Sequence, residues 1–444
     1  MKIRALVGAL ALAGVMAPAF ATNGYFSHGY GMKAKGMGGA ANAMASDAMG
    51  GANNPASMVW VGDRLDLGVD WFRPIRSAQR TGAVTSNGAN PVQLNGKMES
   101  DKKNFLIPEF GYNKMLNSSM SLGVTVYGNG GMNTDYTAQA GAYTCDADGA
   151  PGGATVSANN ILCGSSKLGV NLEQLIIAPT LAYKLNQQHS VGVSPLLGYQ
   201  RFSADGLQAF AGISSDSNNL TNKGHDDAYG FGVRLGWQGR ITDTLTLGAT
   251  YSTKVNMSKF DKYKGLFAEQ GDFDIPENYG LGLAWKAMPA LTVALDYQRI
   301  NYGGVKAIAN SSRQGGGSCT SGGTCLGGSD GIGFGWKDID VWKLGFEYQH
   351  SKALTLRAGY NHGTNPIKPE DVTFNILAPG VVTDHVTLGM TYAMGTNSEL
   401  TVAYMHAMKK SLTGPGTNPY FNNNGTEKIE MYQDSLGVAY GMKF

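Results

Sequence analysis

From residue 62 to the end of the chain, apolar and aromatic side chains repeatedly fall on every second position, in stretches of about ten residues. In DRLDLGVDW, for example, Leu65, Leu67 and Val69 share one parity. A period of two indicates β-strands. Many stretches end in Trp, Tyr or Phe, which is typical of the aromatic girdle at a membrane interface. The alternation predicts fourteen strands, at 62–76, 104–115, 118–131, 170–185, 189–203, 227–241, 244–256, 276–287, 290–301, 338–350, 353–362, 381–395, 398–410 and 428–444.

The connections between these strands alternate between short and long. The short ones read LNSS, NQQ, TD, MP, SK and TN, and the long ones occupy 77–103, 132–169, 204–226, 257–275, 302–337, 363–380 and 411–427. Outer-membrane barrels have an even number of strands, short periplasmic turns and longer outer loops. The pattern therefore predicts an all-β fold, a closed fourteen-stranded antiparallel transmembrane barrel with both termini in the periplasm.

Composition agrees with an exported membrane barrel. Charged residues make up 15% of the 444 residues, and a soluble domain usually has about 25%. The net charge of +2 gives no reason to expect a nucleic-acid partner. The first 21 residues have a basic start, a short apolar run and the end Ala19-Phe20-Ala21, which is typical of a cleaved signal peptide. We therefore expect a signal peptide at 1–21 and a protein of the Gram-negative outer membrane.

The four cysteines all fall in predicted long loops. An exported chain meets an oxidising compartment, so disulfides are expected. The spacing favours the pairs Cys145–Cys163 and Cys319–Cys325, although four cysteines allow three pairings. Apart from Asp146, no His or acidic residue stands at ligand spacing, so neither a metal site nor a cofactor is expected.

A barrel of fourteen strands is wide, and something must fill its lumen. The positions of inward parity hold many Gly and Ala residues and a few charges, among them Arg234, Lys343, Glu347 and Arg357. Residues 22–61 precede the first strand, lack alternation and are rich in Gly, Ala and Met. We expect them to form a plug (the hatch) with short helices inside the barrel of residues 62–444. A disordered leader is the alternative, but such segments carry more charge and proline.

Several stretches resemble the FadL/TodX family of outer-membrane transporters for hydrophobic compounds. They are the leader NGYFSHGYGMKAKGMGGA, the motif Asn53-Asn54-Pro55-Ala56, the strand segments PEFGYNKML and LGVTVYGNGGMNTDY, and the terminal Phe444. The resemblance implies passive uptake of long-chain fatty acids or aromatic hydrocarbons. Surface loops would capture the ligand, the hatch would rearrange, and the ligand would leave sideways through a gap at a kink in the third strand.

The glycines Gly128, Gly130 and Gly131 end the predicted third strand. Glycine weakens a strand and permits bulges, so these residues are the candidates for the kink. A glycine-rich strand end entering its loop is the simpler interpretation. Pro55 fixes φ and pushes the preceding Asn into an extended conformation, so NNPA makes a stiff turn. We expect this turn to be poised against the third-strand gap.

Two outer loops carry more apolar side chains than solvated loops need. The candidates for a capture groove are Leu207, Phe210, Ile213, Phe260, Leu266 and Phe267. Alternatively, these residues pack each loop against itself. The nearby Lys259, Lys262 and Lys264 could meet a ligand carboxylate or lipopolysaccharide phosphates, or form a solvated face.

Other functions explain less of the sequence. A general diffusion porin or a surface adhesin is the main alternative. An outer-membrane lipase needs a Ser and a His in reach, and none of the seven His lies in a recognisable nucleophile motif, so we expect no enzyme. The expected partners are a hydrophobic small molecule, outer-membrane lipid and lipopolysaccharide, with the protein as a monomer. A carboxylate ligand would need an inward cation such as Arg234, Lys343 or Arg357, which could equally pair with inward acids.

Overall fold

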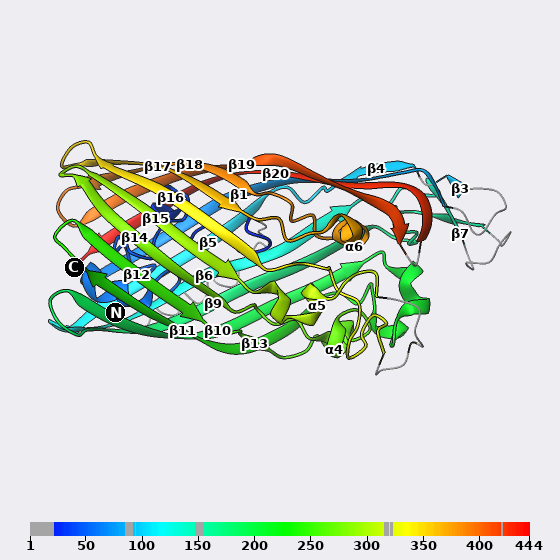
Figure 1. Cartoon of the computed structure of the whole chain (residues 1–444), viewed down its shortest axis with the longest axis horizontal. Helices are drawn as coiled ribbons and strands as arrows, with labels where there is room; N and C mark the ends of the chain where they lie inside the picture. Colours follow the sequence, from blue (N-terminus) through cyan, green and yellow to red (C-terminus); the bar gives the residue numbers. More distant parts are fainter. Residues whose placement is uncertain are drawn as a thin grey trace.

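The computed structural model describes residues 22–84, 92–93, 95–146, 155–314, 319, 323–418 and 421–444. Within them, fourteen long strands form one closed antiparallel sheet, which confirms the predicted barrel (Figure 1). The first strand, β1 (Arg64–Thr81), and the last, β20 (Phe421–Lys443), pair along the whole of β1 and close the sheet. The expected signal peptide at 1–21 lies outside the described residues.

The remaining elements follow in chain order. The other long strands are β5 (Phe105–Asn117), β6 (Met120–Tyr136), β9 (Leu168–Lys184), β10 (His189–Asp205), β11 (Asp226–Arg240), β12 (Leu245–Ser252), β14 (Asn278–Met288), β15 (Leu291–Ile300), β16 (Ile339–Gln349), β17 (Leu354–Gly363), β18 (Asp384–Met394) and β19 (Ser398–Asn418). Short strands are β2 (Ala83–Val84), β3 (Val92–Gln93), β4 (Gly96–Glu99), β7 (Tyr143–Asp146), β8 (Thr155–Ala158) and β13 (Asn256–Met257). The helical turns are α2 (Met32–Lys35), η1 (Pro55–Ser57), α3 (Met58–Val61), η2 (Gln208–Ile213), η3 (Ser217–Asn219), η4 (Asp261–Tyr263), α4 (Ala268–Gly271), η5 (Tyr302–Gly304), α5 (Lys306–Ala309), η6 (Pro369–Asp371) and α6 (Val372–Asn375).

The two ends of the barrel differ. The short turns and the C-terminus lie at one end, and the long connections with α4, α5 and α6 lie at the other (Figure 1). Both expected disulfides, Cys145–Cys163 and Cys319–Cys325, are present in these long connections. Among the described residues, no helix is long and apolar enough to cross a membrane.

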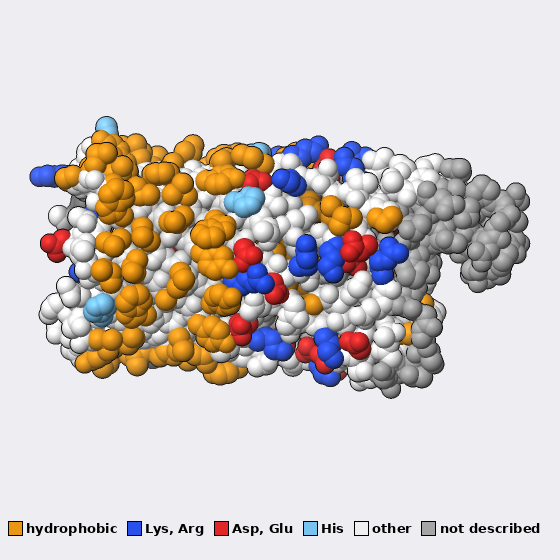
Figure 2. Space-filling view, in the orientation of Figure 1, with side chains coloured by type: hydrophobic (Ala, Val, Ile, Leu, Met, Phe, Trp, Pro, Cys, Tyr) orange, Lys and Arg blue, Asp and Glu red, His pale blue; other side chains and the backbone are white. Residues whose placement is uncertain are grey.

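On the face drawn in Figure 2, apolar side chains form a belt over the half of the barrel next to the short turns, and charged side chains gather beyond its edge. The belt consists of the outward positions of the alternating strands, and many of them are large and exposed: Leu106, Leu122, Leu197, Phe231, Leu235, Leu281, Trp285, Leu295, Trp342, Leu388, Leu436 and Val438. Exposed aromatic residues border it, including Tyr229, Tyr348, Tyr392 and Phe444. So much exposed apolar surface would be unfavourable in water, so the belt is the face that contacts lipid.

On the side of the long connections, several strands continue further beyond the apolar belt than the sequence pattern predicts. The expected loop at 77–103 contains the end of β1 and three short strands, and the expected loop at 411–427 is mostly a continuation of the β19–β20 hairpin. Those predictions were wrong because the apolar–polar alternation exists only where one face meets lipid. Beyond the belt the outer faces are polar, and the period-two signal fades although the ladder continues.

Residues 22–61 thread through the lumen at the short-turn end and are almost entirely buried (Figure 1). Inward glycines bring the wall into contact with them. A Cβ at Gly359 would lie 2.1 Å from the Gly38 nitrogen, and one at Gly248 would lie 1.9 Å from the Asn42 oxygen. Real Cβ atoms do not approach so closely. At these positions the small inward residues therefore let the hatch backbone lie directly on the wall.

This contact yields a test. Replacing Gly359 with Val should destabilise the packed state by about 1–3 kcal/mol, because the added carbons overlap the hatch backbone. The same change at Gly304, where an added Cβ meets nothing within 4 Å, should cost far less. Thermal unfolding of the two variants, followed by circular dichroism, measures the difference. Equal melting temperatures would mean that the hatch is not held by this close approach.

Candidate functional site

The third long strand, β6, leaves its neighbour partway along. Its pairing with β5 ends at Phe110↔Val126, although β5 continues to Phe105. On its other side β6 stays paired with β9, with a register shift between Gly128 and Gly130. The extra residue of this bulge is Asn129. The glycines named from the sequence therefore lie where β6 separates from β5, and a gap in the hydrogen-bonded wall results.

The hatch covers the inner side of this gap. Phe26 forms a bridge with Gly130, Ser27 N donates to Asn129 O at 3.2 Å, and Gly131 N donates to Tyr25 O at 3.1 Å. A Cβ at Gly130 would lie only 1.8 Å from Tyr25 O, so glycine is required for this approach. Where β6 no longer pairs with β5, some of its backbone N–H and C=O groups form hydrogen bonds with hatch residues 25–27 instead.

An aromatic cluster holds the start of the hatch in place. Tyr25 packs against Tyr302 and Trp336, with ring centroids at 5.2 and 6.0 Å, and Tyr302 packs edge-on against Trp336 at 5.1 Å. The Tyr302 hydroxyl accepts from Tyr25 N at 3.0 Å and donates to Asn23 O at 2.7 Å. Two residues of the connection between β15 and β16 therefore hold the same hatch segment that covers the β6 gap.

The Asn-Pro-Ala turn lies elsewhere in the hatch. Asn54 caps η1 by accepting from Ala56 N at 3.0 Å, and its amide donates to Trp237 O at 2.9 Å. Gly192 on β10 and Gly236 on β11 leave the space that this turn fills. The expectation that the turn is poised against the third-strand gap was wrong. Its polar cap needs carbonyl acceptors and a wall without side chains, which β10 and β11 supply. Asn53 instead donates to Tyr30 O at 2.8 Å, within the hatch.

Wall carboxylates bind the backbone of the hatch. The two oxygens of Glu109 accept from Gly31 N and Met32 N, each at 3.1 Å. Asp296 accepts from Ala41 N at 2.7 Å and Asn42 N at 2.9 Å. Short helical turns leave their first N–H groups without partners, and charged acceptors make the stronger hydrogen bonds to them. These inward acids therefore fix the position of the hatch rather than line an open lumen.

Ion pairs add to this anchoring. Lys35 of the hatch pairs with Asp70 on β1 at 2.6 Å, and Lys33 pairs with Glu399 on β19 at 2.6 Å. Burial, together with the nearby Arg64, lowers the pKa of Lys33, and the Glu399 carboxylate opposes this shift. The hatch is thus held to the wall by ion pairs as well as by hydrogen bonds to its backbone.

The inward cations expected to serve a ligand are mostly occupied. Arg234 donates to the carbonyls of Gly51 and Ala52 in the hatch, so it too is an anchor. Arg357 pairs with Glu347 at 2.7 Å. Within the described residues, no hydrogen bond or ion pair ends on Lys343, and Asp296 on the adjacent strand is its opposite neighbour.

The apolar loop residues pack under the outer connections. Leu207, Phe210, Phe260, Leu266 and Phe267 are buried, and Ile213 is half-buried. Ring contacts link the two loops to the barrel and to other connections, for example Phe202–Phe267 at 4.7 Å and Phe210–Phe374 at 5.3 Å. In this closed arrangement the loops pack against themselves and their neighbours. The capture groove remains a prediction, and the neighbouring Lys264 pairs with Asp216 at 3.3 Å.

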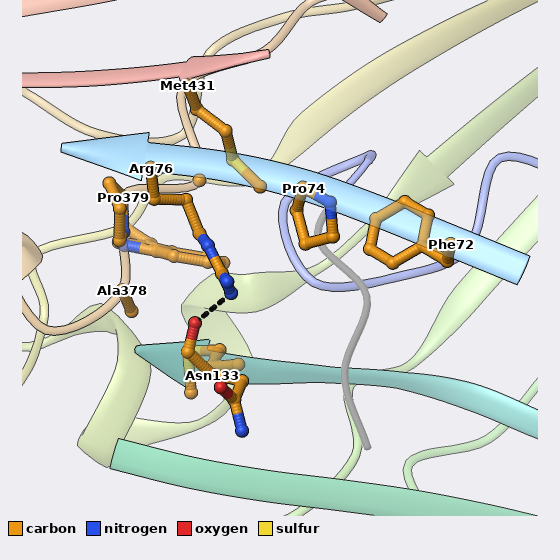
Figure 3. Close-up of a pocket in the computed structure, with 10 residues that line it drawn as sticks. Phe72, Pro74, Arg76, Asn133, Ala378, Pro379 and Met431 are labelled. Atoms are coloured by element: carbon orange, nitrogen blue, oxygen red, sulfur yellow. Dashed lines mark hydrogen bonds between the residues drawn. The ribbon is translucent and has the colours of Figure 1, made fainter. Parts of the chain in front are cut away.

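The cavities near the gap are small. One of about 10 Å³ lies beside Phe72, Met132 and Trp336 (Figure 3), and another of about 30 Å³ lies between Phe26 and Lys343. Such volumes hold one or two water molecules, so a ligand enters only if the surrounding chain moves. A polar vestibule of about 570 Å³ opens beneath the hatch, lined by residues that include Gln238, Arg240, Thr244 and Lys286.

One charged residue of the first cavity was missed from the sequence. Arg76 on β1 is 3% exposed and faces inward, within the segment FRPIRS. The alternation of β1 up to Phe72 carries the signal, because Arg76 has the same inward parity. The expected strand ended at this residue, so its side chain was not considered part of the lumen.

A closed fourteen-stranded barrel with a lipid-facing belt and a lumen filled by its own N-terminal segment defines a plugged outer-membrane transport barrel. The chain belongs to the outer membrane protein transport protein family (OMPP1/FadL/TodX), whose model matches residues 8–444. No curated protein sequence matches it.

Solved structures share the fold at low identity. The toluene transporter TodX of P. putida is 18% identical, over 94% of this chain and 99% of that chain, with a TM-score of 0.65. A FadL homologue from Pseudomonas aeruginosa is 14% identical, over 97% and 100%, with a TM-score of 0.68. The toluene transporter TbuX of Ralstonia pickettii is 17% identical, over 94% and 99%, with a TM-score of 0.62.

The carboxylate anchors can be tested at Glu109. Replacing it with Ala leaves two buried N–H groups of the hatch without acceptors, at a cost of about 1–3 kcal/mol for each. Hydrogen exchange at Gly31 and Met32 should accelerate, while the strand amides stay protected. The control is Glu99→Ala, which removes only an exposed pair with Lys103. Unchanged exchange at the hatch in the Glu109 variant would contradict the anchoring role.

Proposed function

We propose that this protein carries hydrophobic small molecules, namely long-chain fatty acids or related hydrocarbons, passively across the outer membrane. The observation that carries the proposal is the unpaired edge between β5 and β6, covered from inside by hatch residues 25–27. Family membership and the fold shared with two toluene transporters and a FadL homologue support it. The substrate enters from the loops, passes the hatch and leaves sideways through the gap.

The position of the gap favours lateral exit. Leu106 lies on the unpaired part of β5 and is an exposed member of the apolar belt, so the gap opens towards lipid. Pro108, in the same part, has no N–H to donate and does not require a partner there. Release of an apolar solute into water costs about 25 cal/mol of free energy for each Å² of its apolar surface that becomes exposed. Release into the bilayer avoids this cost, so the bilayer is the favourable exit.

The arrangement in the membrane follows from the same proposal. The end with the short turns, the hatch and the C-terminus faces the periplasm. The charged band beyond the belt meets lipopolysaccharide, and the protein acts as a monomer with a complete lumen of its own. A general porin is the less favoured candidate, because the hatch occupies the lumen beside the gap, where the cavities described above measure about 10 and 30 Å³. Removal of residues 22–56 should therefore raise conductance in planar bilayers sharply.

Deleting Asn129 tests the lateral route. Without the extra residue of the bulge, β6 should keep one register with β9 and pair further along β5, which closes the gap. We expect the rate at which cells take up oleate and toluene to fall by about tenfold, because the remaining route ends in water. A tenfold lower rate corresponds to an activation free energy that is higher by about 1.4 kcal/mol.

The matched control deletes Gly141, an exposed residue of an outer connection with nothing within 4 Å of an added Cβ. Surface amounts and the heat-modifiable gel mobility of both variants report folding. Normal uptake by a folded Asn129 deletion would refute lateral exit through this gap.

A further inference from the structure

Two histidines are buried side by side between the hatch and the wall. His28 comes directly after hatch residues 25–27, which cover the gap, and His385 faces inward near the start of β18. Their rings are nearly parallel, with an interplanar angle of 12° and centroids 6.0 Å apart. Their exposed fractions are 2% and 0%. The hatch therefore meets β18 through two side chains of the type whose ordinary pKa lies closest to neutral pH.

The ring nitrogens of this histidine pair are poorly satisfied. Nε2 of His28 and both ring nitrogens of His385 lack a hydrogen-bond partner among the described residues. A neutral imidazole has one N–H donor and one acceptor, whereas the protonated ring has two donors and a positive charge. A buried charge is unfavourable unless it is paired and hydrogen-bonded. The contact therefore accommodates two neutral rings and disfavours a proton on either one.

Cations surround His28 in the lumen. Lys35 of the hatch and Lys343 of β16 both act on it electrostatically, and Lys35 is held in place by its ion pair with Asp70 on β1. Burial lowers the pKa of His28 well below its ordinary value, His385 and the two lysines add to this shift, and the backbone of Lys35 opposes it. A proton on His28 is therefore disfavoured by burial and repelled by its neighbours.

The charged and titratable groups next to His385 lie on the outer face of the barrel. They are Asp384 of β18, His362 of β17 and His406 of β19. The Asp384 carboxylate accepts from the Tyr360 hydroxyl at 2.5 Å and contacts His362 Nδ1 at 2.8 Å. Successive side chains of a strand point to opposite faces, so this carboxylate is directed away from His385. It therefore does not supply the acceptor that a protonated His385 needs.

The histidine contact is continuous with the cover of the gap. Ser27 precedes His28 and donates its N–H to Asn129 O, at the bulge of β6, at 3.2 Å. A Cβ at Gly39 would lie 1.8 Å from His28 O, so a second hatch segment packs directly on the histidine backbone. A displacement of His28 from β18 therefore also moves residues that cover the gap.

We propose that His28 and His385 form a pH-sensitive contact, which keeps the hatch closed at neutral pH and releases it in acid. A proton on either ring places a charge without a partner in the closed contact, whereas water solvates the same charge once the hatch has moved. The inference rests on the proposed function and adds a regulation to it, because acid raises the population of the state in which a substrate passes the hatch.

The direction of the effect follows from the linkage between proton binding and opening. A ring that stays neutral in the closed state and takes up a proton in the open state stabilises the closed state above the ordinary histidine pKa of about 6.5. That stabilisation is lost as the pH falls below this value. Between about pH 7 and pH 5.5, one such histidine shifts the equilibrium towards the open state by about eightfold, and two shift it further.

Hydrogen exchange in the purified full-length protein, in nonionic micelles, tests the inference. The amides of Ser27 and Gly131 donate the hydrogen bonds between hatch and β6. Their exchange, corrected for the direct effect of pH on amide chemistry, should accelerate by about eightfold or more between about pH 7 and pH 5.5, while strand amides stay protected. His28→Gln and His385→Gln keep a polar side chain that does not titrate. Each should reduce the acceleration, and the double variant should abolish it.

The matched controls are His362→Gln and His406→Gln. These histidines lie on the strands that flank β18, and they contact Asp384 and Asp434 on the outer face. Each change removes a histidine without touching the contact between hatch and wall, so the acid-dependent exchange should remain.

Uptake of toluene by cells tests the regulatory role, because toluene has no titratable group. The uptake rate should rise between about pH 7 and pH 5.5 in cells with the wild-type protein and stay constant in cells with the double variant. Cells without the protein give the background rate at each pH. Acid-dependent exchange without acid-dependent uptake would overturn the regulatory role.

The outcomes separate this inference from the proposed function. An absence of acid-dependent exchange in the wild type, or equal acceleration in the double variant, overturns the histidine contact but leaves hydrophobic transport standing. If toluene enters no faster with the wild-type protein than without it at either pH, the proposed function fails, and the regulation fails with it. If the double variant does not fold, as judged by heat-modifiable mobility, the single variants decide. Unchanged acceleration in both of them contradicts the inference.

Discussion

The structure depends on one constraint: a polypeptide backbone must lie inside a barrel without leaving its polar groups unpaired. Hatch residues 22–61 have few helical hydrogen bonds of their own, so the wall must supply partners. Glu109 and Asp296 accept hatch N–H groups, and Arg234 donates to hatch carbonyls. Inward glycines such as Gly359 allow the distance these bonds need. The charged side chains and the glycines of the wall therefore act together: the charges bind the hatch backbone, and the glycines let it come close enough to be bound.

The same logic explains the break in the wall. A strand that leaves its neighbour exposes backbone groups, which is unfavourable next to lipid. Here β6 leaves β5 after Val126, and the hatch pairs with β6 at Gly130 in its place. Residues 25–27 therefore supply hydrogen-bond partners to β6 at the gap. Those residues in turn contact Tyr302 and Trp336 from the connection between β15 and β16. The outer connection, the hatch and the gap therefore form one connected set of contacts.

The functional residues divide by how well they could be predicted. The third-strand glycines were located because glycine in a strand has a local meaning. The lumen charges were assigned to the correct face by parity, but their roles were not. Arg234 and Arg357 looked available for a ligand, yet each has a partner distant in sequence. Arg76, with no acidic partner, was overlooked because the alternation that marks a lumen residue ends near it. Phe260 and Phe267 looked exposed but are buried by contacts between loops.

The sequence by itself determined the strand number, the alternation of short and long connections, the lipid-facing parity and the presence of a plug. All of these follow from rules that act over a few residues, since the bilayer imposes period two and glycine or proline marks each turn. Only the tertiary structure decided where the Asn-Pro-Ala turn lies, which cations are paired and how far the strands extend beyond lipid. Those outcomes depend on atoms brought together from distant parts of the chain, such as Asn54 with Trp237, and no local pattern encodes them.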